Sequence, residues 1–419
     1  MPATDWQKEI YLNGFAGKKP NVSIDLASLE QRAKSVLTTR AFDYIAGGAG
    51  LEHTVLRNRS AFDQYKIIPR MLNNVSERDT SVNILGTQLP TPLLLSPVGV
   101  LELAHHNADL AVARAAAATG VPFIFSSQAS VPMENVAAAM GTSPRWFQMY
   151  WSKSRDLVAS FARRAEACGC TAIVVTLDTT LLGWRTRDLD LAYLPFLEGK
   201  GIAQYTSDPV FQKLMDEPVE GPPVEQKISA HSISGLIKMT RAYPGGNFIS
   251  KLLSGRPRKA VQKFVSIYSN PALTWNDLSF LRGNTRLPIL LKGILHSDDA
   301  SKAIDHGMNG VIISNHGGRQ VDGAVATLDV LPKIADVVKK RIPVLLDGGV
   351  RGGADMFKAI ALGADAVCIG RPYAYGLAIA GETGVYEVIR NFMADFEFTM
   401  ALSGCKNVND IRDISNFRV

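Results

Sequence analysis

Eight short apolar runs constrain the fold of this 419-residue chain more than any other feature of its sequence. They cover residues 92–96, 122–126, 146–150, 172–176, 288–292, 311–314, 343–347 and 366–370. Runs of this length and apolarity are typical of strands buried on both faces, as in a parallel sheet. Segments of helical length lie between most of them, for example residues 110–118, 157–168, 297–306 and 354–362. The sequence therefore alternates predicted strands and helices eight times.

Eight such units predict an α/β fold, a closed (β/α)8 TIM barrel over about residues 91–400. An open doubly wound sheet is the alternative, although it would rarely need eight such similar units. Residues 1–90 are predicted to form an N-terminal cap of the same single domain (residues 1–419), with helices at 25–38 and 40–46. The composition, 46% hydrophobic and 20% charged, fits a large buried core and excludes a disordered chain.

One connection departs from the regular spacing. About 110 residues separate the end of the fourth predicted strand near Asp178 from the start of the fifth near Pro288. Loops that long in a compact domain are normally functional or partly disordered, and βα loops leave a barrel at its catalytic rim. We therefore predict a lid-like insertion over about residues 188–275. An inert surface insertion is the alternative.

The charge pattern favours no macromolecular partner. A net charge of +6 is a weak field for a surface of this size. The densest basic segment, residues 256–263, is interpreted as a solvated face, because no zinc finger or RNA-binding aromatic pattern accompanies it. We predict no nucleic-acid partner and no membrane partner, since no apolar run is long enough to span a bilayer.

Cysteine and targeting signals point to a reducing compartment. The four cysteines have no metal-ligand spacing and are predicted to be free thiols, so no metal site is expected; they are Cys168, Cys170, Cys368 and Cys405. The N-terminus has no secretory leader, and cytoplasm is the predicted location. The glycosylation sequons at Asn21, Asn58 and Asn74 are therefore expected to stay unmodified.

Polar residues stand at the carboxyl ends of nearly all the predicted strands. They are Pro97, Ser126, Ser127, Gln148, Tyr150, Thr176, Asp178, Lys292, Ser314, His316, Asp347, Gly370 and Arg371, of which Pro97 and Gly370 have no hydrogen-bonding side chain. The strand ends of a barrel meet at one face, where catalytic groups gather. A single Ser or Thr in such a place is more often structural, but a nearly complete ring of them predicts one convergent site.

The segment Ser314-Asn315-His316-Gly317-Gly318-Arg319-Gln320 carries the sharpest chemical signal. Histidine has an unperturbed pKa that allows proton abstraction near neutrality, so His316 is the candidate base. Arg319 can hold a carboxylate with two parallel hydrogen bonds. Asp178, which ends another strand, can orient the imidazole and stabilise its protonated form. We therefore predict His316 as a general base with Asp178 as its partner.

Two glycine-rich turns follow the last two strands, where barrels often bind phosphate. They are Asp347-Gly348-Gly349-Val350-Arg351-Gly352-Gly353 and Gly370-Arg371-Pro372. Glycines let backbone amides approach an anion, and Arg351 and Arg371 add charge-assisted hydrogen bonds. The pair of turns predicts a phosphorylated cofactor or substrate. Lys292, which ends an otherwise apolar strand, suits an anionic ring atom, with a solvated lysine as the alternative.

Taken together, these motifs resemble the FMN-dependent L-2-hydroxy acid oxidizing family over about residues 43–405. The resemblance implies an FMN-binding (β/α)8 barrel. It implies that His316 accepts a proton, that Asp178 holds it, and that Tyr150 binds the substrate hydroxyl. Arg319, Arg185 and Tyr44 would hold the substrate carboxylate.

The same resemblance assigns the FMN site. Lys292 would stabilise negative charge on the reduced ring. The ring and ribityl contacts would be Pro97, Val98, Gly99, Ser126, Gln148, Thr176 and Ser314. The ribityl and phosphate contacts would be Asp347, Gly349, Arg351, Gly370 and Arg371. Whether the electrons leave the substrate as a hydride or through a carbanion stays open.

Within the family, lactate monooxygenases are the most similar group, through residues 183–189, 195–197 and 208–213. Gly99 stands where many family oxidases have alanine, and Gln128 departs from the aromatic residue of glycolate oxidases. The resemblance implies oxidation of L-lactate by O2 to acetate, CO2 and water. An oxidase that releases the keto acid and hydrogen peroxide, or a dehydrogenase with another acceptor, are the alternatives. A homotetramer or homo-octamer is expected. A phosphate-binding barrel without redox chemistry is the competing class.

Overall fold

A closed barrel of eight parallel strands forms the centre of the molecule. The computed structural model describes residues 2–218 and 229–412. The barrel strands are β3 (Leu93–Leu95), β4 (Phe123–Ser126), β5 (Arg145–Tyr150), β6 (Ala172–Thr176), β7 (Ile289–Ile294), β8 (Gly310–Ile313), β9 (Val344–Leu346) and β10 (Ala366–Ile369). They pair in chain order, and β10 pairs with β3 to close the ring. The predicted barrel is confirmed, strand by strand, and the open sheet is excluded.

Side chains from all eight strands fill the inside of the barrel. They form one cluster that includes Leu94, Ile124, Trp146, Val174, Leu290, Ile312, Leu345 and Cys368. Neighbouring strand residues such as Leu93 and Leu95 belong to a separate, larger core with the outer helices. Because successive side chains of a strand point to opposite faces, an all-apolar run supplies both cores at once. A short hairpin, β1 (Val82–Ile84) and β2 (Thr87–Leu89), adds Ile84 and Leu89 to the inner cluster.

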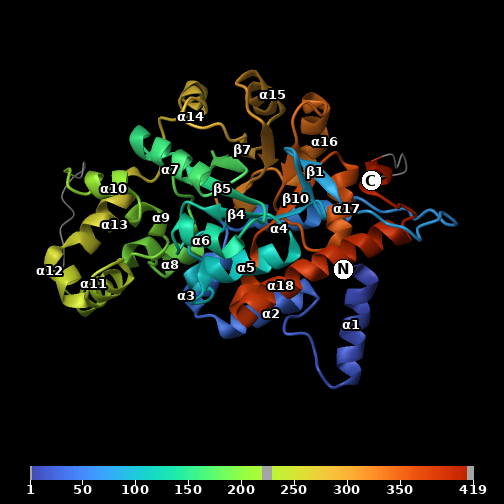
Figure 1. The fold of residues 1–419 in the computed structure, drawn as a ribbon, viewed down its shortest axis with the longest axis horizontal. Coiled ribbons are helices and arrows are strands. Elements are labelled where there is room, and N and C mark those ends of the chain that lie inside the picture. The colour runs from blue at the N-terminus through green and yellow to red at the C-terminus, as the bar shows by residue number, and fades with distance from the viewer. Residues whose placement is uncertain (1, 219–228, 413–419) are drawn as a thin grey trace.

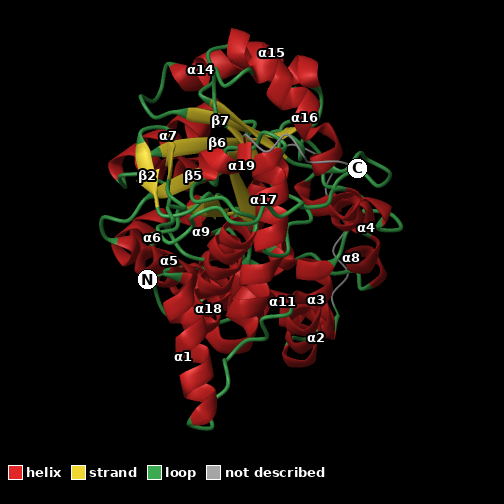
Figure 2. Ribbon diagram, turned by 90° about the vertical axis from the view of Figure 1, so that its right-hand side faces the viewer, coloured by secondary structure: helices red, strands yellow, loops and turns green. Residues whose placement is uncertain are grey.

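Helices surround the barrel (Figures 1 and 2). The main ones are α5 (Ala108–Thr119), α6 (Met133–Met140), α7 (Arg155–Ala167), α15 (Ser297–Asp305), α16 (Thr327–Val338), α17 (Gly353–Ala361) and α18 (Arg371–Leu402). Four of them, α5, α7, α15 and α17, cover the helices predicted between the strands. In the described part of the chain, no helix is long and apolar enough to cross a membrane. The four cysteines are free thiols.

The N-terminal cap consists mainly of helices. They are α1 (Ala3–Phe15), α2 (Leu26–Val36), α3 (Thr39–Ala46), α4 (His53–Ser60) and the short η1 (Ala61–Gln64). The two predicted helices are confirmed as α2 and α3, whose N-termini are capped by the side chains of Asp25 and Thr38. Both α1 and α2 pack against α18 (Figure 1).

The long connection between β6 and β7 is largely helical where the structure describes it. It contains α8 (Thr186–Asp190), η3 (Pro195–Glu198), α9 (Ala203–Thr206), α10 (Pro209–Leu214), α11 (Ala230–Ala242), α12 (Phe248–Ser254), α13 (Arg256–Ile267), η4 (Trp275–Asp277) and α14 (Leu278–Arg282). Figure 1 shows α11, α12 and α13 at the end of the molecule away from both termini.

Gly201 joins this insertion to the barrel. Its N–H donates to Glu102 at 3.0 Å, and its φ of +66° lies in the left-handed region. A Cβ at this position would lie 2.6 Å from a methyl carbon of Val100. The insertion is therefore attached where only a glycine fits without rearrangement.

Candidate active site

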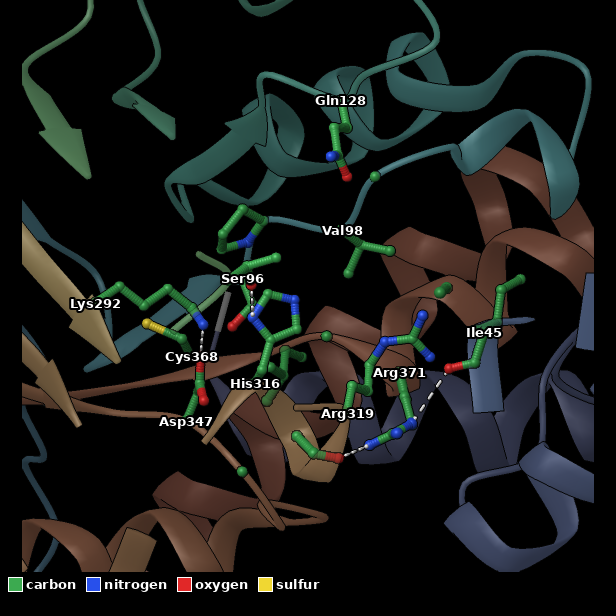
Figure 3. Close-up of a pocket in the computed structure, with 18 of the residues that line it drawn as sticks. Ile45, Ser96, Val98, Gln128, Lys292, His316, Arg319, Asp347, Cys368 and Arg371 are labelled. Carbon is green, nitrogen blue, oxygen red and sulfur yellow. Dashed lines mark hydrogen bonds and ion pairs between the residues drawn. The ribbon is translucent and has the colours of Figure 1, made fainter. Parts of the chain in front are cut away.

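A single cavity gathers most of the predicted site residues at the carboxyl ends of the strands (Figure 3). Its volume is about 1060 Å³ with its open mouth included. The predicted residues that line it are Tyr44, Pro97, Val98, Gly99, Tyr150, Arg185, Lys292, His316, Arg319, Asp347, Gly349, Arg351, Gly370 and Arg371. Five predicted residues do not line it: Ser126, Gln148, Thr176, Asp178 and Ser314. These five are hydrogen-bonded to one another or to lining residues such as Lys292 and His316.

His316 is held from behind by the predicted carboxylate. Its Nδ1 lies 2.7 Å from Asp178 Oδ1 and 3.3 Å from the hydroxyl of Thr179, which donates to the same carboxylate oxygen at 3.0 Å. Its Nε2 faces the phenol of Tyr150 at 3.5 Å. The carboxylate fixes Nδ1 as the protonated nitrogen and leaves the cavity-facing Nε2 free to accept a proton.

Burial sets the protonation states of this pair. Removal from water lowers the pKa of His316, and Asp178 opposes that effect without cancelling it. Burial alone would raise the pKa of Asp178, but the charges of His316 and Lys292 outweigh it and lower the pKa below its ordinary value. At neutral pH the pair is therefore a neutral imidazole beside a carboxylate, which is the state a general base requires.

The loop that bears His316 is fixed in an unusual conformation. His316 has a φ of +58°, in the left-handed region, and its N–H donates to Ser314 Oγ at 3.0 Å. The side-chain amides of Asn315 and Asn58 pair reciprocally, each nitrogen donating to the other oxygen at 2.8 Å. Asn58 belongs to α4, so the N-terminal cap clamps the catalytic loop from outside the barrel.

Four arginines line the cavity, and none has a carboxylate within ion-pair distance among the described residues; Arg319 and Arg185 are the two on the side of His316 and Tyr44, and Arg351 and Arg371 belong to the glycine-rich turns. Arg319 donates to the carbonyls of Tyr44 at 2.6 Å and Gly47 at 2.8 Å. Arg185 donates to the side-chain oxygen of Gln320 at 3.3 Å. Burial, with the nearby charge of Arg185, lowers the pKa of Arg319 to about 9. Buried positive charge that lacks an internal partner favours a bound anion, and a carboxylate matches the guanidinium fork.

A row of buried polar groups crosses the rim from strand to strand. Ser126 Oγ donates to Gln148 Oε1, and Gln148 Nε2 donates to Thr176 Oγ1, both at 2.9 Å. These three side chains satisfy one another and form a support behind the cavity wall. Their hydrogen bonds fix the amide orientation of Gln148, which an isolated glutamine would leave free.

Lys292 extends the polar support into the cavity. Its ammonium donates to Ser314 Oγ at 2.8 Å and lies 3.2 Å from Asp347 Oδ2. Burial would lower the pKa of Lys292, but the carboxylates of Asp347 and Asp178 raise it by more. Lys292 is therefore a fixed positive charge in the wall (Figure 3).

The glycine-rich turns form the opposite end of the cavity. Gly349 has a φ of +84°, and a Cβ there would lie 2.0 Å from the carbonyl oxygen of Asn58. Arg351 donates to the carbonyl of Val350, and burial followed by the charge of Arg371 lowers its pKa. The amino terminus of α18 opens onto the same space at Gly370. Glycine backbone, an arginine and a helix N-terminus together suit a phosphate.

Arg371 makes contacts with backbone carbonyls that its predicted phosphate role did not include. Its guanidinium donates to the carbonyls of Ile45, Gly47 and Gly317, at 3.2, 2.9 and 2.9 Å. Figure 3 shows it between His316 and Ile45. These contacts join the cap helix α3 to the catalytic loop. A contact of Arg371 with phosphate stays a prediction.

Several lining residues were not predicted from the sequence. They are Ile45, Ser96, Gln128, Thr179, Leu182, Phe196, Gly317, Tyr268, Gly348, Val350, Cys368, Ile369 and Ala374. Thr179 could have been found, because it directly follows Asp178 in the sequence. Phe196 and Tyr268 come from the insertion, where no strand periodicity indicates which side chains point inward.

Comparisons with known proteins show which family the chain belongs to. The family model described as FMN-dependent dehydrogenase matches residues 33–416. An L-lactate oxidase from Lysinibacillus sphaericus is 40% identical over 407 residues, covering 97% of this chain and 96% of that protein. The 2-hydroxyacid oxidase 1 of Homo sapiens is 38% identical and covers 91% and 93%. A crystal structure of mandelate oxidase superposes with a TM-score of 0.76 at 33% identity, covering 95% of this chain and 99% of that one.

Proposed function

Because the chain belongs to the FMN-dependent 2-hydroxy acid oxidoreductase family, we propose that it oxidises a small L-2-hydroxy acid, foremost L-lactate, with O2 as the electron acceptor. One observation carries the proposal. The free Nε2 of His316, the phenol of Tyr150 and two arginines without carboxylate partners converge on one cavity. A 2-hydroxy acid offers a hydroxyl and a carboxylate on adjacent carbons, which matches this set of groups.

The residues of the cavity fit FMN. Ser96 Oγ and Asp347 Oδ1 are buried with no hydrogen-bond partner in the described chain, and both residues line the cavity. Unpaired buried polar atoms are costly, and the hydroxyls of a ribityl chain would pair with them. Gly349, Arg351 and the start of α18 would hold the phosphate, and Pro97, Val98 and Gly99 the ring. When bound, FMN takes two electrons from the substrate and passes them to the acceptor.

The protein groups then bind and deprotonate the substrate. Arg319 and Arg185 hold the carboxylate, Tyr150 hydrogen-bonds the hydroxyl, and Tyr44 packs under the guanidinium of Arg319 at 5.1 Å. His316 accepts a proton at Nε2, and the carboxylate of Asp178, 2.7 Å from Nδ1, stabilises the resulting positive charge. The depressed pKa of His316 keeps the base neutral before the reaction.

The fate of the product separates two candidate activities. A lactate monooxygenase converts lactate and O2 into acetate, CO2 and water, which requires pyruvate and peroxide to meet before either leaves. The connection between β6 and β7 supports this outcome, because its Leu182, Phe196 and Tyr268 line the cavity and can retain the product. An oxidase releases pyruvate and hydrogen peroxide instead, and the similarity to the L-lactate oxidase of Lysinibacillus sphaericus favours that candidate. A dehydrogenase with a different acceptor is the third.

Product analysis tests the proposal. The purified holoenzyme is supplied with L-lactate in air, with catalase present so that free peroxide cannot decarboxylate released pyruvate. Acetate equal to the O2 consumed supports the monooxygenase. Pyruvate without acetate overturns that outcome and identifies an oxidase. Failure of L-lactate to bleach the yellow protein under anaerobic conditions rejects lactate as the substrate. A homotetramer or homo-octamer and a cytoplasmic location stay predictions.

A further inference from the structure

The excess of positive over negative charge in this protein comes from one part of the insertion. Residues 229–276 contain seven Lys and Arg and no Asp or Glu. The whole chain has 45 Lys and Arg and 39 Asp and Glu, so the rest of it has 38 and 39. The net charge of +6 therefore comes entirely from this segment. Residues 256–263, predicted to be a solvated face, are one part of this segment.

The same segment exposes an apolar helix face. Helices α11, α12 and α13 pack against one another, and α11 and α13 also pack on η3. α12 buries none of its residues. Ile249 and Leu253, one helical turn apart on α12, are 67% and 83% exposed. Ile233 and Leu236 are exposed on α11. We call this unit, residues 230–267, the basic hairpin.

Three of its exposed charged side chains have no carboxylate partner among the described residues. Arg241, Arg258 and Lys259 are exposed and have no carboxylate within ion-pair distance in residues 2–218 and 229–412. Lys238 pairs with Glu198 at 2.7 Å, and Arg256 donates to Gln212 at 2.7 Å. Arg258 and Lys259 follow Leu253 within six residues, so exposed apolar and cationic side chains adjoin at the α12–α13 junction.

We propose that the basic hairpin is a docking surface for an anionic lipid bilayer. Exposed leucine and isoleucine beside lysine and arginine is the pattern of helices that lie in a bilayer interface, where apolar side chains enter the headgroup region and cations bind acidic headgroups. A second copy of the chain matches less well, because outside this segment the charge is nearly balanced. Nucleic acid would use the cations but not Ile249 and Leu253. The binding is peripheral, since no described helix crosses a membrane, and it revises the prediction of no membrane partner.

The test is co-sedimentation of the holoenzyme with lipid vesicles. Vesicles of phosphatidylcholine alone are compared with an equal mixture of phosphatidylcholine and phosphatidylglycerol, each at low and high salt. We expect binding to the anionic vesicles only, lost at high salt. The variants Ile249→Ser/Leu253→Ser and Arg258→Glu/Lys259→Glu should each lower the partition coefficient at least about tenfold, with turnover of L-lactate unchanged.

Matched controls isolate the surface. Leu72→Ser alters a fully exposed leucine, and Lys18→Glu/Lys19→Glu alters two adjacent exposed lysines far along the chain from the hairpin. Both controls should bind vesicles like the unmodified enzyme. Equal binding to neutral vesicles, no binding to either, or equal loss in the controls overturns the proposal. A change of oligomeric state in the hairpin variants without vesicle binding would identify a second copy as the occupant instead.

Discussion

The rim of the barrel and the insertion after β6 line the same cavity but hold their side chains by different forces. On the rim, hydrogen bonds hold the side chains in place: Asp178 and Thr179 bind the imidazole of His316, and Ser314 binds its backbone N–H. In the insertion, the ring of Phe264 packs against Phe196 and Tyr268, with both centroids 5.1 Å from its own. The backbone N–H of Gly201 in the insertion donates to the carboxylate of Glu102 in the barrel.

This difference divides the site into a rim that positions the reacting groups, the chemistry, and an insertion that encloses the cavity, the containment. Hydrogen bonds fix direction, so a small error in the rim misplaces a proton acceptor. Aromatic packing fixes volume but tolerates substitution by residues of similar shape. The same barrel can therefore keep one reaction while its insertion changes what enters and what is retained. Four substitutions probe this division, from the largest expected effect to the smallest.

His316→Ala should have the largest effect. Removing the base should slow anaerobic bleaching by L-lactate about 10³-fold, while FMN content stays normal, because the imidazole faces the substrate end of the cavity. Stopped-flow absorbance measures the rate. His296→Ala, at a mostly exposed histidine, is the control. Fast bleaching by His316→Ala would show that another group is the base and that the rim does not control the chemistry.

Arg351→Gln should weaken cofactor binding rather than chemistry. Loss of one charge-assisted hydrogen bond to phosphate should raise the Kd for FMN about 10- to 100-fold. The Kd for riboflavin, which has no phosphate, should hardly change. Fluorescence titration of the apoenzyme measures both. An equal loss of affinity for the two flavins would place Arg351 away from the phosphate.

Asp109→Asn tests the hydrogen bonds that link the barrel to the insertion. Asp109 accepts from the N–H of Ser130, and the Ser130 hydroxyl accepts from the backbone N–H of Glu102. The carboxylate of Glu102 in turn accepts from the N–H of Gly201 in the insertion. Burial raises the pKa of Asp109 from 3.8 to about 7. The protonated carboxyl is favoured in the folded state, so its stabilisation is full below the unfolded pKa and is lost as pH rises through 7.

The unmodified enzyme should therefore lose about 2 kcal/mol of stability from this group between about pH 5 and pH 8, and Asp109→Asn should not show that loss. Urea unfolding at the two pH values measures it. Asp156→Asn, at an exposed carboxylate, should leave the pH dependence unchanged. An unaltered slope in Asp109→Asn would mean that Asp109 is ionised in the folded protein.

Phe196→Ala should have the smallest effect on rate and a visible effect on product. We expect a change of kcat/KM for L-lactate of less than about fivefold, with a larger fraction of pyruvate, because the insertion wall is opened without touching the base. Product analysis with catalase measures the ratio. Phe15→Ala, at an exposed phenylalanine, is the control. A rate loss comparable to that of His316→Ala would break the division between chemistry and containment.

The strands and the heart of the site could be predicted from the sequence because they follow one-dimensional rules. An apolar run that ends in a polar residue predicts both a barrel strand and the group at its rim, and on that basis the pairing of Asp178 with His316 is confirmed at 2.7 Å. The contacts of Arg371 could not be predicted, because Ile45 and Gly47 lie more than 320 residues away along the chain. Nor could the inward faces of Phe196 and Tyr268, which depend on how aromatic rings of the insertion pack.

The reciprocal amide pair of Asn58 and Asn315 limits the expression routes that can produce active protein. Asn58-Arg59-Ser60 is an acceptor sequence for N-linked glycans, yet Asn58 is only 2% exposed in the folded protein. A sugar added during secretion would occupy the space of the catalytic loop and stop the cap from closing on it. Expression through a secretory route should thus yield a glycosylated, flavin-poor product, and Asn58→Asp would not be a neutral way to avoid the sugar.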